Sequence, residues 1–342
     1  MESGETLAAG RYHLHRRLGE GGMAEAWLAW DVQLQTWRAI KVLRENVHTA
    51  ARDRFQREAR VMARIHHPNV VAVHDVGDDG GLQFMVLEYM EAGSLSGWLK
   101  RHGALPPRLA VEVMLAVLSA LVRAHEEGVV HRDIKPSNVL VSRDGVPKLG
   151  DFGIAYDEAT IRALTQTGTA LGSLPFASPE QLVNAKGVDR RADVYGAGAL
   201  LYNLLTNRKP VSLYKRGDGD KAWKGLEPML AGVIRRSTLF DADERWPTAK
   251  VMAQALSAAL PDLPPDPPDT PPLGQALEPL PDPGPATLAD NTFVLEPAHE
   301  PKRSKRSLVL VAGVLVALLA LVGGVAIVLA GGAGVAIYLF LG

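Results

Sequence analysis

The spacing of apolar side chains divides the chain into strand-like and helix-like stretches. Residues 11–43 alternate between apolar and polar positions and are interrupted by glycines, which predicts a small antiparallel sheet. Residues 84–90 form a further strand-like run. Apolar positions at the spacing of an α-helix predict helices over 53–65, 106–127 and 193–206. The chain therefore starts with strands and continues mainly with helices.

The end of the chain has a different composition. Residues 261–301 hold 13 of the 23 prolines and no Lys or Arg, so they should form a disordered linker with too little apolar surface to fold. A basic cluster at 302–307 precedes 35 uncharged residues. Because a spanning helix needs about 20 apolar residues, we predict a transmembrane helix over 308–330. Residues 331–342 then form an apolar tail, which lies beyond the span or re-enters the membrane. For the predicted transmembrane helix, a buried core helix is the alternative.

Charge and cysteine content limit the partners and the location. The formal net charge of −1 argues against nucleic-acid binding. The absence of cysteine excludes disulfides and thiolate metal sites and fits a reducing compartment. Residues 1–10 form a loose leader without the basic and apolar regions of a secretory signal. The basic cluster at 302–307 keeps the preceding residues in the cytoplasm, which predicts a single-pass protein of the inner (cytoplasmic) membrane.

The polar residues with the most specific arrangement lie between residues 131 and 153. An Asp-Gly pair at 144–145 separates two β-prone runs and predicts a hairpin. Folding about this turn brings Asn138 opposite Asp151, and Asp133 lies one short loop earlier. An amide and a carboxylate suit Mg²⁺, which leaves a second carboxylate for proton transfer. For each residue alone, a solvated loop group is the alternative.

Residues 18–27 form a glycine-rich turn between strands, where backbone N–H groups can approach phosphate oxygens. In the strand that follows, Lys41 shares a face with the small Ala39. Glu58 lies on the apolar face of the helix predicted over 53–65, and a buried carboxylate needs a partner. Lys41 is the obvious candidate. Taken alone, the glycine-rich turn is equally explained by a plain hairpin, and Lys41 by an edge-strand lysine in water.

In this order, the motifs resemble those of protein kinases. His131–Asn138 is similar to the catalytic loop, and Asp151-Phe152-Gly153 to the metal-binding triplet. Lys135-Pro136 resembles serine/threonine kinases, and the chain as a whole resembles the bacterial PknB-like (Hanks-type) kinases. The resemblance implies an α+β, two-lobed kinase fold with ATP between the lobes. A small antiparallel β lobe would cover about residues 11–90 and a mainly α lobe about 91–260.

The resemblance also implies roles for individual residues. Asp133 would orient and deprotonate the substrate hydroxyl, and Lys135 would steady the transferred phosphoryl group. Asn138 and Asp151 would hold Mg²⁺ or Mn²⁺. Lys41 would pair with Glu58 and bind the phosphates of ATP. The whole ATP site would consist of Leu18, Gly19, Gly21, Gly22, Ala26, Ala39, Lys41, Glu88 and Met90. Structural roles are implied for His131, Arg132, Phe152, Glu180, Asp193 and Arg245.

Residues 154–180 are rich in hydroxyl side chains and show little periodicity. By the resemblance they are the activation segment, with Thr165, Thr167 and Thr169 as phosphosites. Arg132, just before the predicted base, would pair with such a phosphate.

The predicted function is that of a membrane-anchored serine/threonine protein kinase that uses ATP to phosphorylate protein substrates and itself in trans. Small residues spaced four apart in the apolar tail would allow a homodimer. Ala24 replaces the third glycine of the kinase turn, and Ala26 replaces its usual valine. These two departures favour the alternative, a catalytically silent pseudokinase that acts as a membrane-tethered binding module.

Overall fold

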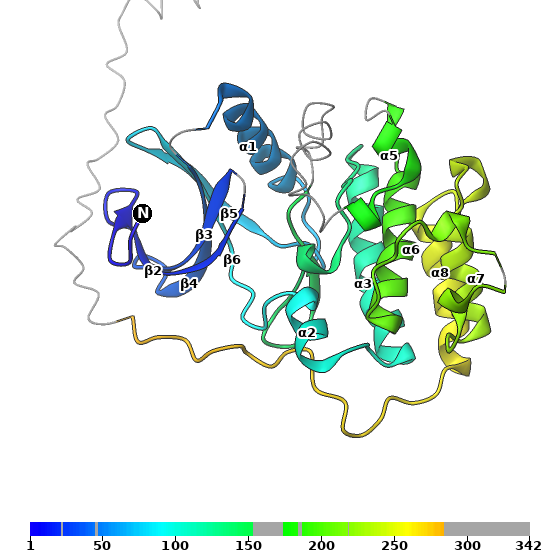
Figure 1. Cartoon of the computed structure of the whole chain (residues 1–342). Coiled ribbons are helices and arrows are strands. Elements are labelled where there is room, and N and C mark those ends of the chain that lie inside the picture. The colour runs from blue at the N-terminus through cyan, green and yellow to red at the C-terminus, as the bar shows by residue number, and fades with distance from the viewer. Residues whose placement is uncertain (22, 45–46, 153–173, 184–186, 218, 284–342) are drawn as a thin grey trace, which may run out of the picture. The chain divides into compact units, whose positions relative to one another are not determined.

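The computed structural model describes residues 1–283, apart from 22, 45–46, 153–173, 184–186 and 218 (Figure 1). Strands dominate the first part of the described chain. They begin within residues 1–10, which were predicted to be a loose leader, because Thr6–Leu7 pairs with the next strand and Leu7 is buried. They form a six-stranded antiparallel sheet in the order β1-β2-β3-β4-β6-β5, with α1 beside it. The elements of this part are β1 (Thr6–Leu7), β2 (Tyr12–Glu20), β3 (Ala24–Asp31), β4 (Thr36–Leu43), α1 (Thr49–Met62), β5 (Val73–Asp79) and β6 (Leu82–Glu88).

The second part is mainly helical and carries one two-stranded sheet, β7–β8. Its helices and strands are α2 (Leu95–His102), α3 (Pro107–Glu126), β7 (Val139–Val141), β8 (Pro147–Leu149), α5 (Pro179–Val183), α6 (Arg191–Thr206), α7 (Pro228–Ser237) and α8 (Ala249–Ala259). Short 3-10 turns are η1 (Pro136–Asn138), η2 (Leu174–Phe176), η4 (Leu213–Lys215), η5 (Lys221–Trp223), η6 (Ala242–Glu244) and η7 (Leu260–Asp262). The order of strands and then helices follows the apolar pattern of the sequence.

The hairpin that the Asp-Gly pair predicts is present between β7 and β8. Val139 pairs with Leu149, and the Gly145 N–H donates to the Ser142 carbonyl at 3.0 Å. Gly145 has φ +79°, a left-handed conformation that glycine adopts without steric cost. The turn therefore fixes the register that brings the two ends of the hairpin together.

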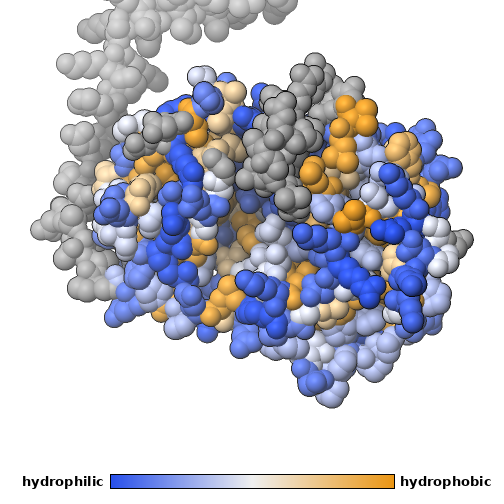
Figure 2. Space-filling view, viewed as in Figure 1, coloured by the Kyte–Doolittle hydropathy of each residue, from blue (hydrophilic) through white to orange (hydrophobic). Residues whose placement is uncertain are grey.

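Helix α6 is buried on nearly all sides and packs against α3, α7 and α8. Its glycines allow neighbouring chain segments to come close. A Cβ at Gly198 would lie 2.4 Å from Ser237 Cβ at the end of α7 and 3.1 Å from Thr238 Cγ2. At α5, by contrast, Leu182 and Val183 are exposed, and Figure 2 shows apolar side chains gathered over this helix.

Residues 261–283 differ from the expectation of a disordered linker. The structure places Leu263 in the hydrophobic core, at 6% exposure, and Leu273 partly buried against that core. Proline content predicted disorder, but a few apolar side chains between the prolines provide contacts with the helical part. The rest of the predicted linker, from residue 284, lies outside the described residues.

The predicted basic cluster, transmembrane helix and apolar tail (302–342) also lie outside the described residues. Within residues 1–283 and their described stretches, no helix has both the length and the apolar character needed to cross a bilayer.

The close packing of α6 gives a test of the core. We expect Gly198→Ala to destabilise the fold by about 1–3 kcal/mol, because its new methyl group would overlap Ser237. Gly232→Ala is the matched control: this glycine is also within a helix, but it has open space around it. The control should be stabilising by up to about 1 kcal/mol through helix propensity alone. Urea unfolding of both variants measures the difference, and equal effects would contradict the packing.

Candidate active site

One ammonium group joins three separate elements of the described chain. Lys41 projects from β4, and its Nζ lies 2.7 Å from Glu58 Oε1 on α1. The same nitrogen lies 2.8 Å from Asp151 Oδ1, just after β8. The ion pair with Glu58 is the one that the helical spacing predicts. The contact with Asp151 was not predicted, and it ties the sheet to the segment that follows β8.

The two carboxylates of this cluster have different surroundings. The Glu58 side chain is only 7% exposed, and burial raises its pKa while Lys41 opposes the shift. The Asp151 side chain is 58% exposed, and the charge of Lys41 lowers its pKa. Burial alone would lower the pKa of Lys41, but Asp151 and Glu58 together raise it. The lysine is therefore charged at neutral pH, and Asp151 is the acid that faces outward.

A row of predicted ATP-site residues crosses three strands. Gly19 lies opposite Ala26, and Ala26 lies opposite Lys41. Ala39 is two residues from Lys41 on the same strand and so shares its face. Leu18 falls at the irregularity that shifts the register just before Gly19. The strands therefore bring the side chains of Ala26, Ala39 and Lys41 to one face of the sheet.

The alanine that replaces the third glycine of the turn belongs to the strand. Ala24 is the first residue of β3, is 7% exposed and lies opposite Leu43. Its carbonyl accepts a hydrogen bond from the Gly21 N–H at 2.9 Å. The turn therefore closes on Ala24 with an ordinary strand conformation, which needs no glycine. Gly22 lies outside the described residues.

The segment after β6 connects the two parts of the molecule. Glu88 ends β6, and its N–H donates to the Ala72 carbonyl at 2.9 Å. Lys148 on β8 lies 2.6 Å from the Glu88 carboxylate, an ion pair that the sequence did not suggest. Met90 is buried, and its carbonyl accepts from the Gly93 N–H at 3.0 Å. Residues 88–93 are called the hinge below.

Asp133 is held in position by two neighbours on its own loop. Lys135 Nζ lies 2.6 Å from its Oδ2, and Asn138 Nδ2 donates to the same oxygen at 2.9 Å. The Asn138 amide also donates to the Asp133 carbonyl at 2.8 Å. Two donors on one carboxylate fix its direction, which a group that accepts a proton from a substrate needs.

The donor set beside this loop suits a hard divalent cation. The Gly150 N–H donates to the Asn138 carbonyl at 2.9 Å, so Asn138 lies opposite Gly150 rather than the predicted Asp151, which is the next residue. Asn138 uses its nitrogen on Asp133 and keeps Oδ1, which accepts from the Ser137 hydroxyl at 3.3 Å, as one oxygen to offer. Asp151 has Oδ1 on Lys41 and keeps its second carboxylate oxygen. Among the described residues no three His, Asp or Glu side chains cluster as a complete metal cage. Two oxygen ligands with the rest supplied by phosphates and water is the usual arrangement for Mg²⁺.

His131 supports the loop as a neutral ring. Its Nε2 donates to the Gly150 carbonyl at 3.1 Å, and its Nδ1 accepts from the Asp133 N–H at 3.2 Å. The ring also packs on Phe152, with centroids 4.6 Å apart. Burial lowers the pKa of His131 below its ordinary value. Protonation would put a hydrogen on Nδ1 against the Asp133 N–H, so the neutral form belongs to this geometry.

Asp193, on α6, organises the start of the catalytic loop. Its carboxylate is 1% exposed and accepts from the His131 N–H at 2.8 Å and the Arg132 N–H at 2.7 Å. His125 Nε2, on α3, lies 2.8 Å from the same carboxylate. Arg132 has φ +68°, which side-chain-bearing residues rarely adopt. The two hydrogen bonds from consecutive N–H groups hold this unusual backbone in place.

Arg245 forms a second buried anchor in the helical part. Its side chain is fully buried and makes a bidentate pair with Glu180, at 2.7 and 2.8 Å. Its remaining hydrogen bonds go to the carbonyls of Leu239, Arg191 and Phe240. All five guanidinium N–H groups can thus be used, which makes burial of this charge acceptable.

Some functional neighbours were missed by sequence reasoning. Gln181 is 4% exposed, and its Nε2 donates to the Arg132 carbonyl at 2.8 Å. Its Oε1 accepts from Ser178, so α5 is linked to the catalytic loop. His125 stands in an apolar helix that reads as core, and Lys148 in a short strand. Among these residues, only Gln181 could have been suspected from the sequence, because it follows Glu180. The direction of its side chain depends on tertiary structure.

The predicted phosphosites lie outside the described residues. They are Thr165, Thr167 and Thr169 in the stretch 153–173. Gly153, the last residue of the predicted metal-binding triplet, belongs to the same stretch.

The comparisons with known proteins agree with this geometry. The protein kinase domain family matches residues 12–262. The chain is 35% identical to serine/threonine-protein kinase PrkC of Bacillus subtilis over 268 residues, which cover 73% of this chain and 41% of PrkC. It is 35% identical to serine/threonine-protein kinase PknL of Mycobacterium tuberculosis over 271 residues, 75% of this chain and 67% of PknL.

A solved structure shows the same fold. The crystal structure of the PknI kinase domain from Mycobacterium tuberculosis covers 75% of this chain and 98% of its own, with a TM-score of 0.60 and 28% identity. The chain therefore belongs to the protein kinase family, and within it to the bacterial serine/threonine protein kinases of the Hanks type. It spans less than half of the length of PrkC.

The neutral state of His131 predicts a pH dependence. Because burial lowers the pKa of His131, the unfolded chain binds a proton at this residue more readily than the folded chain does, so the free energy of unfolding falls as the pH falls through about 6.5. Between pH 7.5 and 5.5 we expect the wild type to lose about 1 kcal/mol more than His131→Phe. Urea titrations at both pH values measure the two losses. Equal losses would show that the fold does not lower the pKa of His131.

Proposed function

We propose that this chain is a membrane-anchored serine/threonine protein kinase that transfers the γ-phosphoryl group of ATP to protein hydroxyl groups. The observation that supports this best is the placement of Asp133. Its carboxylate is fixed by Lys135 and Asn138, and Asp151, just after β8, lies 2.8 Å from Lys41. This arrangement supports a site in which a base, two metal ligands and a phosphate-binding lysine act together.

The mechanism follows from the roles of these groups. The substrate hydroxyl oxygen attacks the γ-phosphorus, its proton passes to Asp133, and the bond to the bridging oxygen of ADP breaks. Lys135, which already contacts Asp133, offers a positive charge to the transferred phosphoryl group. Lys41, held by Glu58, does the same for the other phosphates. When bound by Asn138 and Asp151, Mg²⁺ or Mn²⁺ supplies charge neutralisation for the phosphate oxygens.

The strand positions favour a nucleotide beneath the sheet. Ala26 and Ala39 offer a flat, small-residue surface beside Lys41, and the glycine-rich turn lies at the end of the same face. Glu88 and Met90 would offer backbone groups to adenine at the hinge. The pseudokinase alternative has less support, because Ala24 lies within a regular strand and the lysine–glutamate pair is intact.

The sequence supports the finer parts of the proposal. The uncharged stretch 308–330, after the basic cluster at 302–307, supports a single span of the inner membrane with the kinase domain in the cytoplasm. The threonines at 165, 167 and 169 support autophosphorylation in trans, with a homodimer through the membrane helix as one arrangement that allows it.

Radiolabel transfer from ATP tests the activity directly. We expect Asp133→Asn in the full chain to reduce phosphate incorporation into protein by about 10²–10⁴-fold, because the proton acceptor is lost. Asp53→Asn, at an exposed position on α1, is the matched control and should retain the wild-type rate. Peptide mapping of the wild-type product should place phosphate at Thr165, Thr167 or Thr169. Equal incorporation by Asp133→Asn and the wild type would reject the proposed function.

A further inference from the structure

After the last helix, the chain stays in contact with the rest of the described structure. After η7, residues 263–278 continue without helix or strand, as the yellow-to-orange trace that passes below α2 toward the sheet in Figure 1. This segment, called the strap below, makes specific contacts with the helical part, with the hinge and with the sheet. The family match ends at residue 262, so the strap lies beyond it.

The first contacts of the strap are with α3. Arg108 donates to the Leu263 carbonyl at 2.7 Å, and the Leu109 N–H donates to Asp266 Oδ1 at 3.3 Å. The residue that precedes α3 is Pro106, which gives the helix no side-chain cap. Asp266 therefore supplies, from a distant part of the sequence, the acceptor and the negative charge that a helix N-terminus favours.

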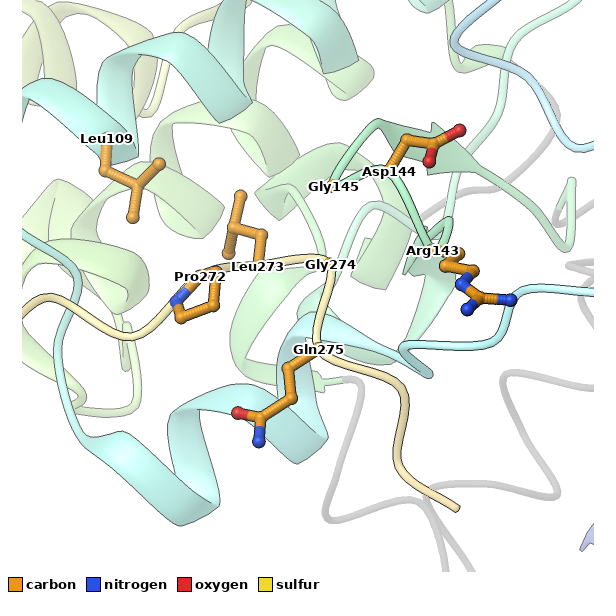
Figure 3. A pocket seen from close by; sticks show the side chains of 8 residues that line it. All are labelled: Leu109, Arg143, Asp144, Gly145, Pro272, Leu273, Gly274 and Gln275. Atoms are coloured by element: carbon orange, nitrogen blue, oxygen red, sulfur yellow. The ribbon is translucent and has the colours of Figure 1, made fainter. Parts of the chain in front are cut away.

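The middle of the strap lies against the turn of the β7–β8 hairpin. Figure 3 shows it running between Leu109 and the residues of that turn, where it borders a groove of about 690 Å³. A Cβ at Gly274 would lie 2.3 Å from the Arg143 carbonyl oxygen and 2.6 Å from the Gly145 nitrogen. Only glycine permits this approach of two backbones, while the neighbouring Leu273 packs against the core.

The last contacts of the strap are with the hinge and the sheet. The Leu277 N–H donates to the Glu91 carbonyl at 3.2 Å. Its side chain lies over Gly93, where a Cβ would be 2.6 Å from Leu277 Cδ1. Glu278 then pairs with Arg16 of β2 at 3.2 Å. The strap thus contacts elements on both sides of the hinge.

Arg16 connects this end of the strap back to the hinge itself. The guanidinium nitrogen that pairs with Glu278 also donates to the Tyr89 hydroxyl at 3.4 Å. Burial raises the pKa of Tyr89, so the hydroxyl keeps its proton at neutral pH. Tyr89 lies between Glu88 and Met90, the two residues proposed to bind adenine through their backbone.

We propose that the strap is a positioning element for the nucleotide site, which holds the hinge in the conformation that binds adenine. Leu277 and Gly274 are its positioning residues. The proposal deepens the proposed function and rests on it for the identity of the ligand. The strap contains six prolines, which reduce the conformational freedom of the undocked segment. A few contacts are then enough to keep it docked.

Gly274→Val in the full chain tests the proposal, because the larger side chain cannot pass the Arg143 and Gly145 backbone. Ala276→Val, at an exposed position two residues along the strap, is the matched control. Hydrogen exchange is followed in peptides containing Leu109 and Leu277 and in hinge peptides over 88–93. The affinity for ADP is measured on the same samples by calorimetry.

We expect Gly274→Val to speed exchange of the Leu109 and Leu277 amides and of the hinge about tenfold, and to weaken ADP binding about fivefold. Ala276→Val should match the wild type. Leu277→Ala, which keeps the backbone but removes the contact with Gly93, should weaken ADP binding in the same direction and serves if Gly274→Val does not fold.

Two results would overturn the proposal. In one, Gly274→Val and Leu277→Ala leave all exchange rates unchanged, so the strap does not dock. In the other, the strap amides exchange faster while the hinge and the ADP affinity stay as in the wild type. If the wild type binds no ADP, the proposed function fails, but the hinge exchange rates still decide whether the strap holds the hinge.

Discussion

The structure depends on one positive charge that two acids share. Lys41 joins the sheet to α1 through Glu58 and to the catalytic loop region through Asp151. Removing Lys41 leaves both acids without their shared partner, and for Glu58, whose side chain is only 7% exposed, this is costly. The shared lysine therefore fixes the distance between the two parts of the molecule where a nucleotide would bind, and it does so before any ligand is present.

The helical part provides rigid support for the other half of the site. Asp193 holds two consecutive backbone N–H groups of the catalytic loop, and His131 then holds the N–H of Asp133. Arg245, whose side chain is fully buried, fastens the segment around Glu180 through a bidentate ion pair. These contacts form a chain from Asp193 on α6 through His131 to Asp133. In the proposed function, an acid held in this way needs little rearrangement when substrate arrives.

Much of this arrangement was predictable because it depends on local spacing. The Asp-Gly pair at 144–145 predicts the hairpin, and the hairpin places Asn138 beside Asp151. Helical spacing predicts the inward direction of Glu58. The approach of Gly274 to the hairpin turn was not predictable, because it depends on where two distant segments meet. Proline content alone suggested disorder for the strap, since composition does not show that Asp266 caps α3.

The rate of phosphoryl transfer in Lys41→Met is the most direct test of the account. At saturating Mg²⁺ and ATP, we expect transfer by the full chain to fall by about 10²–10³-fold, because the charge that holds the phosphates and joins the two parts is lost. Lys100→Met, an exposed lysine on α2, is the matched control and should keep the wild-type rate. A Lys41→Met protein that transfers phosphate as fast as Lys100→Met would contradict the account.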